Sequence, residues 1–242
     1  MKIKNIEWPM YFDEIVNIDD DYIDIFVELD DGFTYTMEVA TCKWYYTYMN
    51  TYETNYLPYS PPKIIVKNLT KENIANALEE YIQDDGYWLK VYLLSVEREH
   101  AFDIEIINKL VNEFENTPMK LQSKGIFIEN IVYPHLSINN DSKIDIDVIL
   151  NDSIVYKISA VTPNYYLTYM QEKNVTHMPV GTYDLVLKDI TKENIKNVLE
   201  NYLHYDAFWL KFAHLIKKHG NVFSCELLNS RINELKLNLE DE

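Results

Sequence analysis

The sequence predicts an α+β fold made by tandem duplication of one unit. Three observations predict it: a pattern that repeats along the chain, short segments that alternate apolar and polar residues, and longer segments with apolar residues at helical spacing. The chain has 242 residues, of which 47% are hydrophobic. This length and composition suit one or two domains with apolar cores.

The internal repeat is clearest where residues 68–74 match residues 189–195, an offset of 121 positions. At this offset residues 19–115 align with 140–236 without a gap, and about 34 of about 97 pairs are identical. Chance would give several times fewer identities. We therefore divide the chain into a first half, residues 1–118, and a second half, residues 119–242, each the size of a small α+β domain.

Each unit begins with a pattern typical of strands. Ile23, Ile25, Val27 and Leu29 alternate with residues that are mostly acidic, which predicts a strand with one apolar face. Asp-Asp-Gly at 30–32 is a hairpin-turn signal. The return strand is expected over 33–39, the second half repeats the hairpin over 144–150 and 154–160, and an earlier strand is expected near 3–8 and 126–132.

Helices and one more strand complete the unit. Thr41 and Thr162 are placed to cap short helices over 42–50 and 163–171, and Thr70 and Thr191 to cap longer helices. The order β-β-β-α-β-α-α predicts a mostly antiparallel sheet covered on one face by helices. The remaining segments are a buried strand at 64–66 and 185–187, a helix from 70 to about 84–86, a helical piece around 88–94, and a helix over about 103–115.

Charge is strongly negative and unevenly distributed. The net charge of −17 repels nucleic acid and favours basic partners. Residues 1–120 hold 10 Lys and Arg against 23 Asp and Glu, net −13, and residues 121–242 hold 12 against 16, net −4. This asymmetry is consistent with a first half that binds a basic surface and a second half with a structural role. Neutral sequence drift would also explain it.

An acidic run supplies the candidate partner-binding residues. It has three interpretations: a solvated sheet face, a calcium site, or a docking surface for a basic protein. The spacing lacks the EF-hand pattern and its glycine, which disfavours calcium. The candidate residues are Asp19, Asp20, Asp21, Asp24, Glu28, Asp30 and Asp31.

A second repeated group combines Asp85, Trp88 and Lys90, which recur at 206, 209 and 211. These residues are compatible with a site, but we favour a structural interpretation. In it the Trp anchors the core, the Asp caps the following helix and the Lys faces solvent.

Signatures of catalysis, cofactor binding or metal binding are absent from the sequence. No zinc-protease, nucleophile-elbow or phosphate-loop pattern occurs, and the two cysteines, Cys42 and Cys225, have no cysteine counterpart in the other half. We therefore expect no cofactor, no metal site and no enzymatic activity. Deep pockets in both halves, each lined by several residues with shifted pKa values, would favour an enzyme instead.

Targeting signals are likewise not apparent. The first residues form no apolar signal-peptide core, and no run of about 18 apolar residues occurs. A cytoplasmic location without membrane contact is the expectation.

In acidity, α+β character and lack of catalytic motifs, the chain resembles the immunity proteins that bacteria pair with secreted toxins. The segment 64–90 is also similar to uncharacterised bacterial domains. The first resemblance implies a binding protein that uses an acidic face to cover a basic toxin, although it transfers no functional residues. The alternative is a structural or scaffold protein in which the two repeats pack together.

Overall fold

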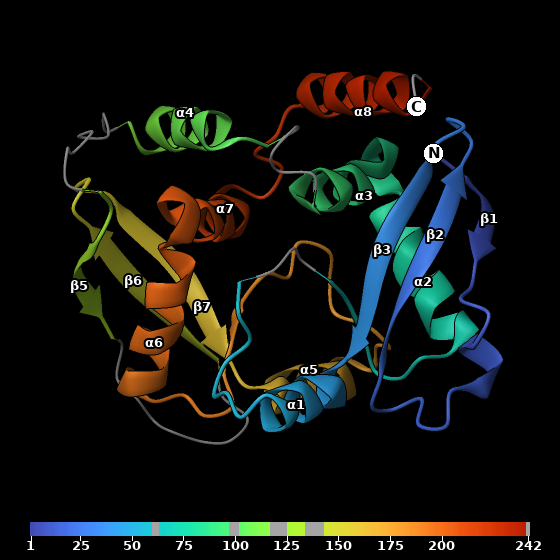
Figure 1. The fold of residues 1–242 in the computed structure, drawn as a ribbon, viewed down its shortest axis with the longest axis horizontal. Helices are drawn as coiled ribbons and strands as arrows, with labels where there is room; N and C mark the ends of the chain where they lie inside the picture. Colours follow the sequence, from blue (N-terminus) through green and yellow to red (C-terminus); the bar gives the residue numbers. More distant parts are fainter. Residues whose placement is uncertain (60–62, 97–101, 117–124, 134–142, 241–242) are drawn as a thin grey trace.

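The computed structural model confirms the α+β class: two four-stranded mixed sheets stand at opposite ends of the molecule's long axis (Figure 1). The structure describes residues 1–59, 63–96, 102–116, 125–133 and 143–240, so the predicted boundary at 118/119 lies outside the described residues. Eight α-helices occur in these ranges. None of them combines the length and apolar character needed to cross a membrane.

The first half follows the predicted order of elements closely. The alternating apolar residues form a strand, and Thr41 and Thr70 cap helices by accepting hydrogen bonds from the backbone N–H groups three residues later. The elements are β1 (Ile3–Glu7), a 3-10 helix (Phe12–Glu14), β2 (Tyr22–Leu29), β3 (Thr34–Thr41), α1 (Cys42–Thr51), β4 (Ile64–Val66), α2 (Lys71–Tyr81), α3 (Gln83–Val96) and α4 (Ile104–Glu115).

The second half contains the same series of strands and α-helices. Its elements are β5 (Ile128–Val132), β6 (Lys143–Leu150), β7 (Val155–Val161), α5 (Pro163–Lys173), β8 (Leu185–Val186), α6 (Lys192–Tyr202), α7 (His204–His219) and α8 (Cys225–Glu240). Positions in the two halves are compared below at the 121-residue offset of the sequence repeat. The duplication itself stays a prediction from the sequence.

Each sheet is mostly antiparallel, as predicted, with one parallel pairing. The strand order is β1-β2-β3-β4 in the first sheet and β5-β6-β7-β8 in the second. The pairs β3–β4 and β7–β8 are parallel because a crossover through α1 or α5 joins them. Three helices follow the fourth strand, in line with the three helical segments expected at 70 to about 84–86, around 88–94 and about 103–115, although the summary order β-β-β-α-β-α-α counts only two. Three residues with positive φ at 84–86 interrupt the first turns of α3.

The apolar core runs through both halves. The inward side chains of β2 and β6 are buried, and α2, α3, α6 and α7 cover this face of the two sheets. A second, smaller cluster lies between α1 and α5, which pack side by side midway between the sheets (Figure 1). It includes Tyr45 and its counterpart Tyr166. The core therefore joins the halves.

The last helix of each half packs on the other half. Helix α4, from the first half, lies against α7 beside the second sheet, whereas α8, from the second half, lies against α3 (Figure 1). Each apolar helix face is thus buried by a partner about a hundred residues or more away in the chain. The two halves exchange helices.

Short segments are exchanged in the same way. The N–H of Leu57 donates to the carbonyl of Val186 over 2.9 Å, and at the equivalent place the N–H of Met178 donates to the carbonyl of Ile65 over 2.9 Å. Each segment thereby adds backbone hydrogen bonds to the fourth strand of the other half's sheet. Contacts between the halves therefore involve both the fourth strands and the last helices.

Candidate functional site

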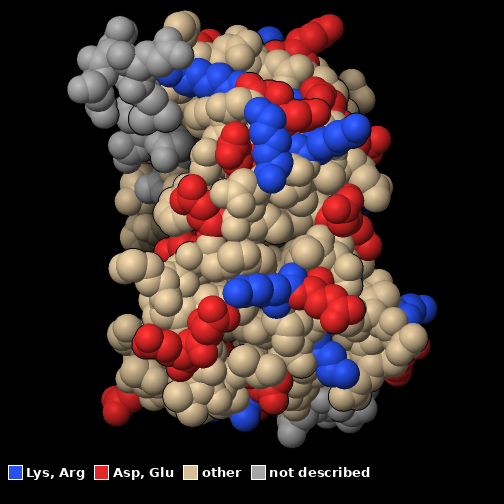
Figure 2. Space-filling model, turned by 90° about the vertical axis from the view of Figure 1, so that its right-hand side faces the viewer, with Lys and Arg blue, Asp and Glu red and all other residues tan. Residues whose placement is uncertain are grey.

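The seven predicted partner-binding carboxylates lie along β2 and at both of its ends. Asp24 and Glu28 are on the outer face of the strand, opposite the buried core side chains. Residues 19–21 precede the strand and residues 30–31 follow it, so these groups are about 25 Å apart. Charged side chains on this side of the molecule form small groups separated by uncharged surface (Figure 2). The seven residues therefore do not form one cation site.

Asp30 and Asp31, which follow β2, have structural partners within the chain. Asp31 Oδ2 accepts hydrogen bonds from the hydroxyl of Tyr35 over 3.0 Å and from Lys236 Nζ of α8 over 3.2 Å. Asp30 Oδ1 accepts one from the backbone N–H of Lys2 over 2.9 Å. This end of β2 therefore stabilises the hairpin and holds the exchanged helix α8.

At the other end of β2, a pocket of about 440 Å³ opens between the sheet and α1. We call it the aromatic pocket. The ring centroids of Tyr22 and Trp44 are 4.7 Å apart, those of Trp44 and Tyr48 5.4 Å, and those of Tyr48 and Tyr52 4.6 Å. Positions 44, 48 and 52 are four residues apart, which places them on one side of α1 and its C-cap.

Carboxylates border the aromatic pocket. Glu38 and Lys63 line it as an ion pair. Burial lowers the pKa of Lys63 to about 8, although nearby Asp24 opposes the shift. Asp20 Oδ2 accepts a hydrogen bond from Thr47 over 2.9 Å, and its Oδ1 is buried with no hydrogen-bond donor among the described residues. The pocket thus combines aromatic walls with negative charge.

The second half has a pocket of about 330 Å³ at the equivalent place, which we call the lysine pocket. Tyr165 and Tyr169 line it at the positions that Trp44 and Tyr48 hold in the first half. Lys143 stands where the first half has a tyrosine, and its Nζ lies 5.5 Å from the ring centroid of Tyr165. The chain therefore supplies its own cation to this aromatic ring.

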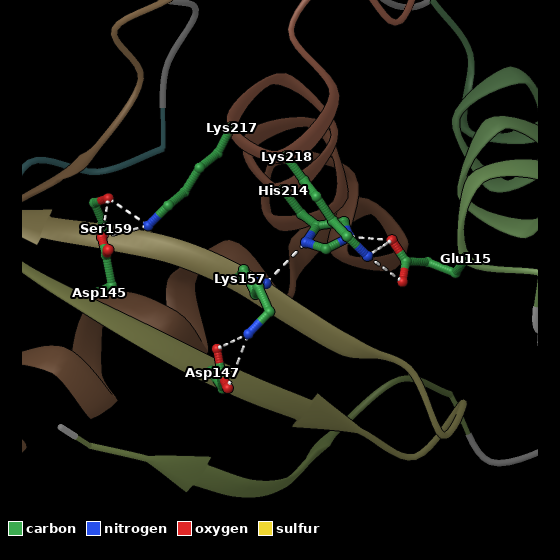
Figure 3. Close-up of polar contacts among 8 residues, drawn as sticks. All are labelled: Glu115, Asp145, Asp147, Lys157, Ser159, His214, Lys217 and Lys218. Carbon is green, nitrogen blue, oxygen red and sulfur yellow. Dashed lines mark hydrogen bonds and ion pairs between the residues drawn. The ribbon is translucent and has the colours of Figure 1, made fainter.

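Lysines also pair with the carboxylates on the outer face of the second sheet (Figure 3). Lys217 of α7 forms an ion pair with Asp145, and Lys157 Nζ lies 3.1 Å from Asp147 Oδ1. The first-half positions that correspond to these two lysines hold Val96 and Thr36.

One position carries a buried charge of opposite sign in the two pockets. Lys63 of the aromatic pocket corresponds to Asp184 of the lysine pocket. Burial raises the pKa of Asp184, although Lys143, 3.4 Å away, opposes the shift. The two pockets therefore present different titratable groups at this position, an ammonium in the first half and a carboxyl in the second.

Glu115, His214 and His219 lie close enough together to suggest a metal site. However, the N–H of Lys157 donates to His214 Nδ1 over 2.8 Å, so the neutral ring carries its proton on Nε2, which is 2.9 Å from Glu115 (Figure 3). Lys218 Nζ lies 2.6 Å from both Glu115 oxygens. These donors already satisfy the carboxylate, so the cluster fits an anchor between α4 and α7 rather than a metal site.

The repeated Asp-Trp-Lys group is structural, but two of the predicted roles are wrong. Lys90 is only 3% exposed and does not face solvent. Its Nζ donates to the carbonyl oxygen and a carboxylate oxygen of Asp85 and to Asn229 Oδ1 of α8, over 2.6, 2.8 and 2.7 Å. The hydrogen bond from Lys90 lowers the pKa of Asp85, which therefore binds the lysine instead of capping a helix. Lys211 repeats the arrangement with Asn108 of α4.

The two tryptophans of this group differ in burial. Trp209 is fully buried, as a core anchor should be, whereas Trp88 is half-buried. Trp88 packs against Gly181 of the second half, where an added Cβ would lie 2.5 Å from its ring. Gly181 also has a φ of +74°, which favours glycine. The core-anchor prediction therefore holds for Trp209 and only partly for Trp88.

Sequence reasoning identified the acidic border of the aromatic pocket but not its walls. Asp20, Asp21 and Asp24 were candidates, whereas Trp44 and Lys63 were not. The high tyrosine content and the four-residue spacing along α1 were the available signals. Comparison of the chain with protein-family models, curated proteins and solved structures found no match, so function must be inferred from the geometry of the site.

Proposed function

We propose that this chain is a non-enzymatic binding protein that docks a basic protein on its first half, as an immunity-type inhibitor does with a basic toxin. The observation that carries the proposal is the difference between the two outer sheet faces. In the second half, lysines on the sheet and on α7 pair with Asp145 and Asp147. In the first half Val96 stands at the position of Lys217, so Asp24, the counterpart of Asp145, lacks this lysine and adds a negative charge. The pair of Asp147 and Lys157 is replaced by the uncharged Phe26 and Thr36.

The residue types around this surplus suit a protein interface. Tyr11, Tyr22, Phe26 and Tyr52 are exposed large side chains, and burial, followed by the charge of Asp24, raises the pKa of Tyr22. Aromatic side chains are enriched in protein interfaces because they provide large contact areas at a small entropic cost. A basic partner would therefore find aromatic contacts beside carboxylates on the first sheet.

Net charge supports the same proposal at longer range. The whole chain carries −17, and most of that surplus belongs to residues 1–120. An uneven negative field steers basic proteins towards the more acidic half and speeds their association. The second half, whose sheet carboxylates are paired, then serves mainly as support.

The test measures binding of a basic toxin encoded beside this chain's own gene. Association rates of the intact chain and of the triple variant D19N/D21N/D24N would be measured by surface plasmon resonance at low and physiological salt. We expect the variant to associate at least about tenfold more slowly at low salt, because steering is lost. The difference in association rate between the intact chain and the variant should become smaller as the salt concentration rises.

The matched control is the triple variant E129Q/E172Q/E193Q, which removes the same charge from exposed positions of the second half that lie outside the exchanged helix α8. It should associate nearly as fast as the unmodified chain. Equal slowing by both triple variants would show a general charge effect and contradict a first-half docking surface. A lack of binding to basic toxins would remove the proposal.

The alternative is a scaffold protein in which the two repeats pack together. The exchange of α4 and α8 favours this candidate, because it packs each half against the other. A scaffold would tolerate D19N/D21N/D24N without loss of any binding activity, which separates it from the docking proposal.

A further inference from the structure

We propose that the aromatic pocket binds the guanidinium group of an arginine side chain from the partner protein. The inference rests on the proposed function, because it names the group through which a basic partner would be held. It concerns the pocket between β2 and α1, whose walls are Tyr22, Trp44, Tyr48 and Tyr52.

The lysine pocket shows what such a site accommodates. There Lys143 Nζ lies 5.5 Å from the ring centroid of Tyr165 and 3.4 Å from an Asp184 oxygen, so a cation sits between an aromatic ring and a carboxylate. Tyr165 corresponds to Trp44, and Lys143 corresponds to Tyr22. The aromatic pocket keeps the ring at position 44 but has no cation at position 22, and its own ammonium, Lys63, lies near Tyr22 instead.

Charge balance gives an independent reason. The lysine pocket is lined by Lys143 and Lys217 against Asp145 and Asp184, two of each sign (Figure 3 shows the pair of Lys217 and Asp145). The corresponding positions of the aromatic pocket supply a single ammonium, Lys63, whose pocket-lining partner is Glu38. Asp24 lies opposite Glu38 in the pairing of β2 with β3. In the second half Lys217 neutralises the corresponding Asp145, but its counterpart in the first half is Val96, so the charge of Asp24 adds to that of Glu38.

Further carboxylates at the rim increase this surplus. Asp20 holds the pocket-lining Thr47 through one oxygen, and its other oxygen is buried with no hydrogen-bond donor among the described residues. Asp21 is next to Tyr22 and accepts its backbone N–H over 2.8 Å. An added cation would therefore enter a field that favours it.

The shape and chemistry of the pocket favour arginine over lysine. A guanidinium is planar, is weakly hydrated and stacks on aromatic faces, and it can donate to two carboxylate oxygens at once. The 440 Å³ is the space that remains with Lys63 in place. Lys63 Nζ lies 5.9 Å from the ring centroid of Tyr22, so an incoming guanidinium would contact the Trp44 side of the pocket.

The experiment titrates the full chain, labelled with nitrogen-15, with N-acetylarginine amide while the indole N–H signal of Trp44 is followed by NMR. The buried Trp209 serves as the internal reference. N-acetylcitrulline amide, which has the same shape but no charge, is the control ligand. We expect saturable shifts at Trp44 with the arginine probe and at least about tenfold weaker binding of the citrulline probe.

A variant gives the sharper test. Y22K places in the aromatic pocket the cation that the lysine pocket contains, and we expect it to weaken binding of the arginine probe at least about tenfold. T34K adds the same charge to the outer face of the neighbouring strand β3, opposite Glu28 and about 20 Å from position 22, and should change binding less than about threefold. Because position 22 is half-exposed and the second half tolerates lysine there, Y22K should fold normally.

Three results would overturn the inference: no shift at Trp44, equal binding of the arginine and citrulline probes, or unchanged binding by Y22K. Each can occur while D19N/D21N/D24N still slows association with a basic toxin. In that case the proposed function stands without the arginine site. Conversely, arginine binding at Trp44 without any basic protein partner would support the site and count against the proposed function.

Discussion

Lys90 shows how one buried charge can hold a distant helix. Its ammonium has three acceptors, two on Asp85 and one on Asn229 of α8. The turn that it stabilises contains Asp84, Asp85 and Gly86 at φ of 50°, 59° and 68°, a left-handed conformation that costs energy for the two aspartates. The same side chain therefore secures a strained turn and an exchanged helix.

Replacing this lysine should reduce stability. We expect K90M to lower the free energy of unfolding by about 2–3 kcal/mol, because the strained turn and α8 lose the charged hydrogen bonds of this buried ammonium. Urea unfolding followed by circular dichroism measures the change. The control is K196M, which removes an exposed lysine that pairs with Glu200 four residues later, and should cost less than about 0.5 kcal/mol. A K90M variant as stable as K196M would contradict the role of Lys90.

Glu115 gives a prediction of pH dependence. Burial alone would raise its pKa, but hydrogen bonds from Lys218 and His214 outweigh burial and lower the pKa from 4.5 to about 2. A carboxyl with a lowered folded-state pKa stabilises the protein above its unfolded-state pKa, and the stabilisation is lost as pH falls towards 2.

The variant E115Q should therefore be less stable than the unmodified chain at pH 7, by an amount on the order of 1 kcal/mol, and about equally stable near pH 2. Urea unfolding of both proteins across this range measures the difference. A difference that stays constant with pH would show that the carboxylate charge has no role in holding α4 to α7.

At the scale of elements, the exchanged segments near Leu57 and Met178 should behave as parts of a sheet. Their N–H groups donate to Val186 and Ile65 of the other half. We expect both amides to exchange with deuterium about as slowly as amides within β3 and β7. Val16, which is fully exposed, gives the fast reference in the same NMR experiment. Fast exchange at Leu57 and Met178 would mean that the segments do not remain paired.

Element boundaries were more predictable than element partners. The alternation from Ile23 to Leu29 and the cap at Thr70 depend on neighbours in the chain, so local patterns revealed β2 and α2. The apolar stripe of α4 showed that one face is buried but not that the other half buries it. Solvent exposure of Lys90 was the default expectation for a charge, since its acceptor Asn229 lies 139 residues away. The aromatic pocket was missed for the same reason, because β2 and α1 meet only in the folded chain.

For the whole molecule, the exchanges predict that the halves depend on each other. Co-expression of residues 1–118 and 119–242 as two separate pieces tests this dependence. We expect the two pieces to stay together as a one-to-one complex in native mass spectrometry and to separate in urea, because strand and helix contacts cross between them. Pieces that separate without denaturant would contradict this mutual dependence.

The presence of both pockets in one chain, held together by the helix and strand exchange, also determines how the two pockets can change over time. In a symmetric dimer of one short chain, every substitution appears in both pockets at once, so a mutation that opens one site also alters its twin. Here the two pockets belong to one chain and mutate separately. Lysines at 143 and 217 can keep one pocket neutral while Tyr22 and Val96 leave the other negative. Two similar halves in one chain can therefore differ in the charge of their pockets, while the strands and helices that hold the halves together stay the same.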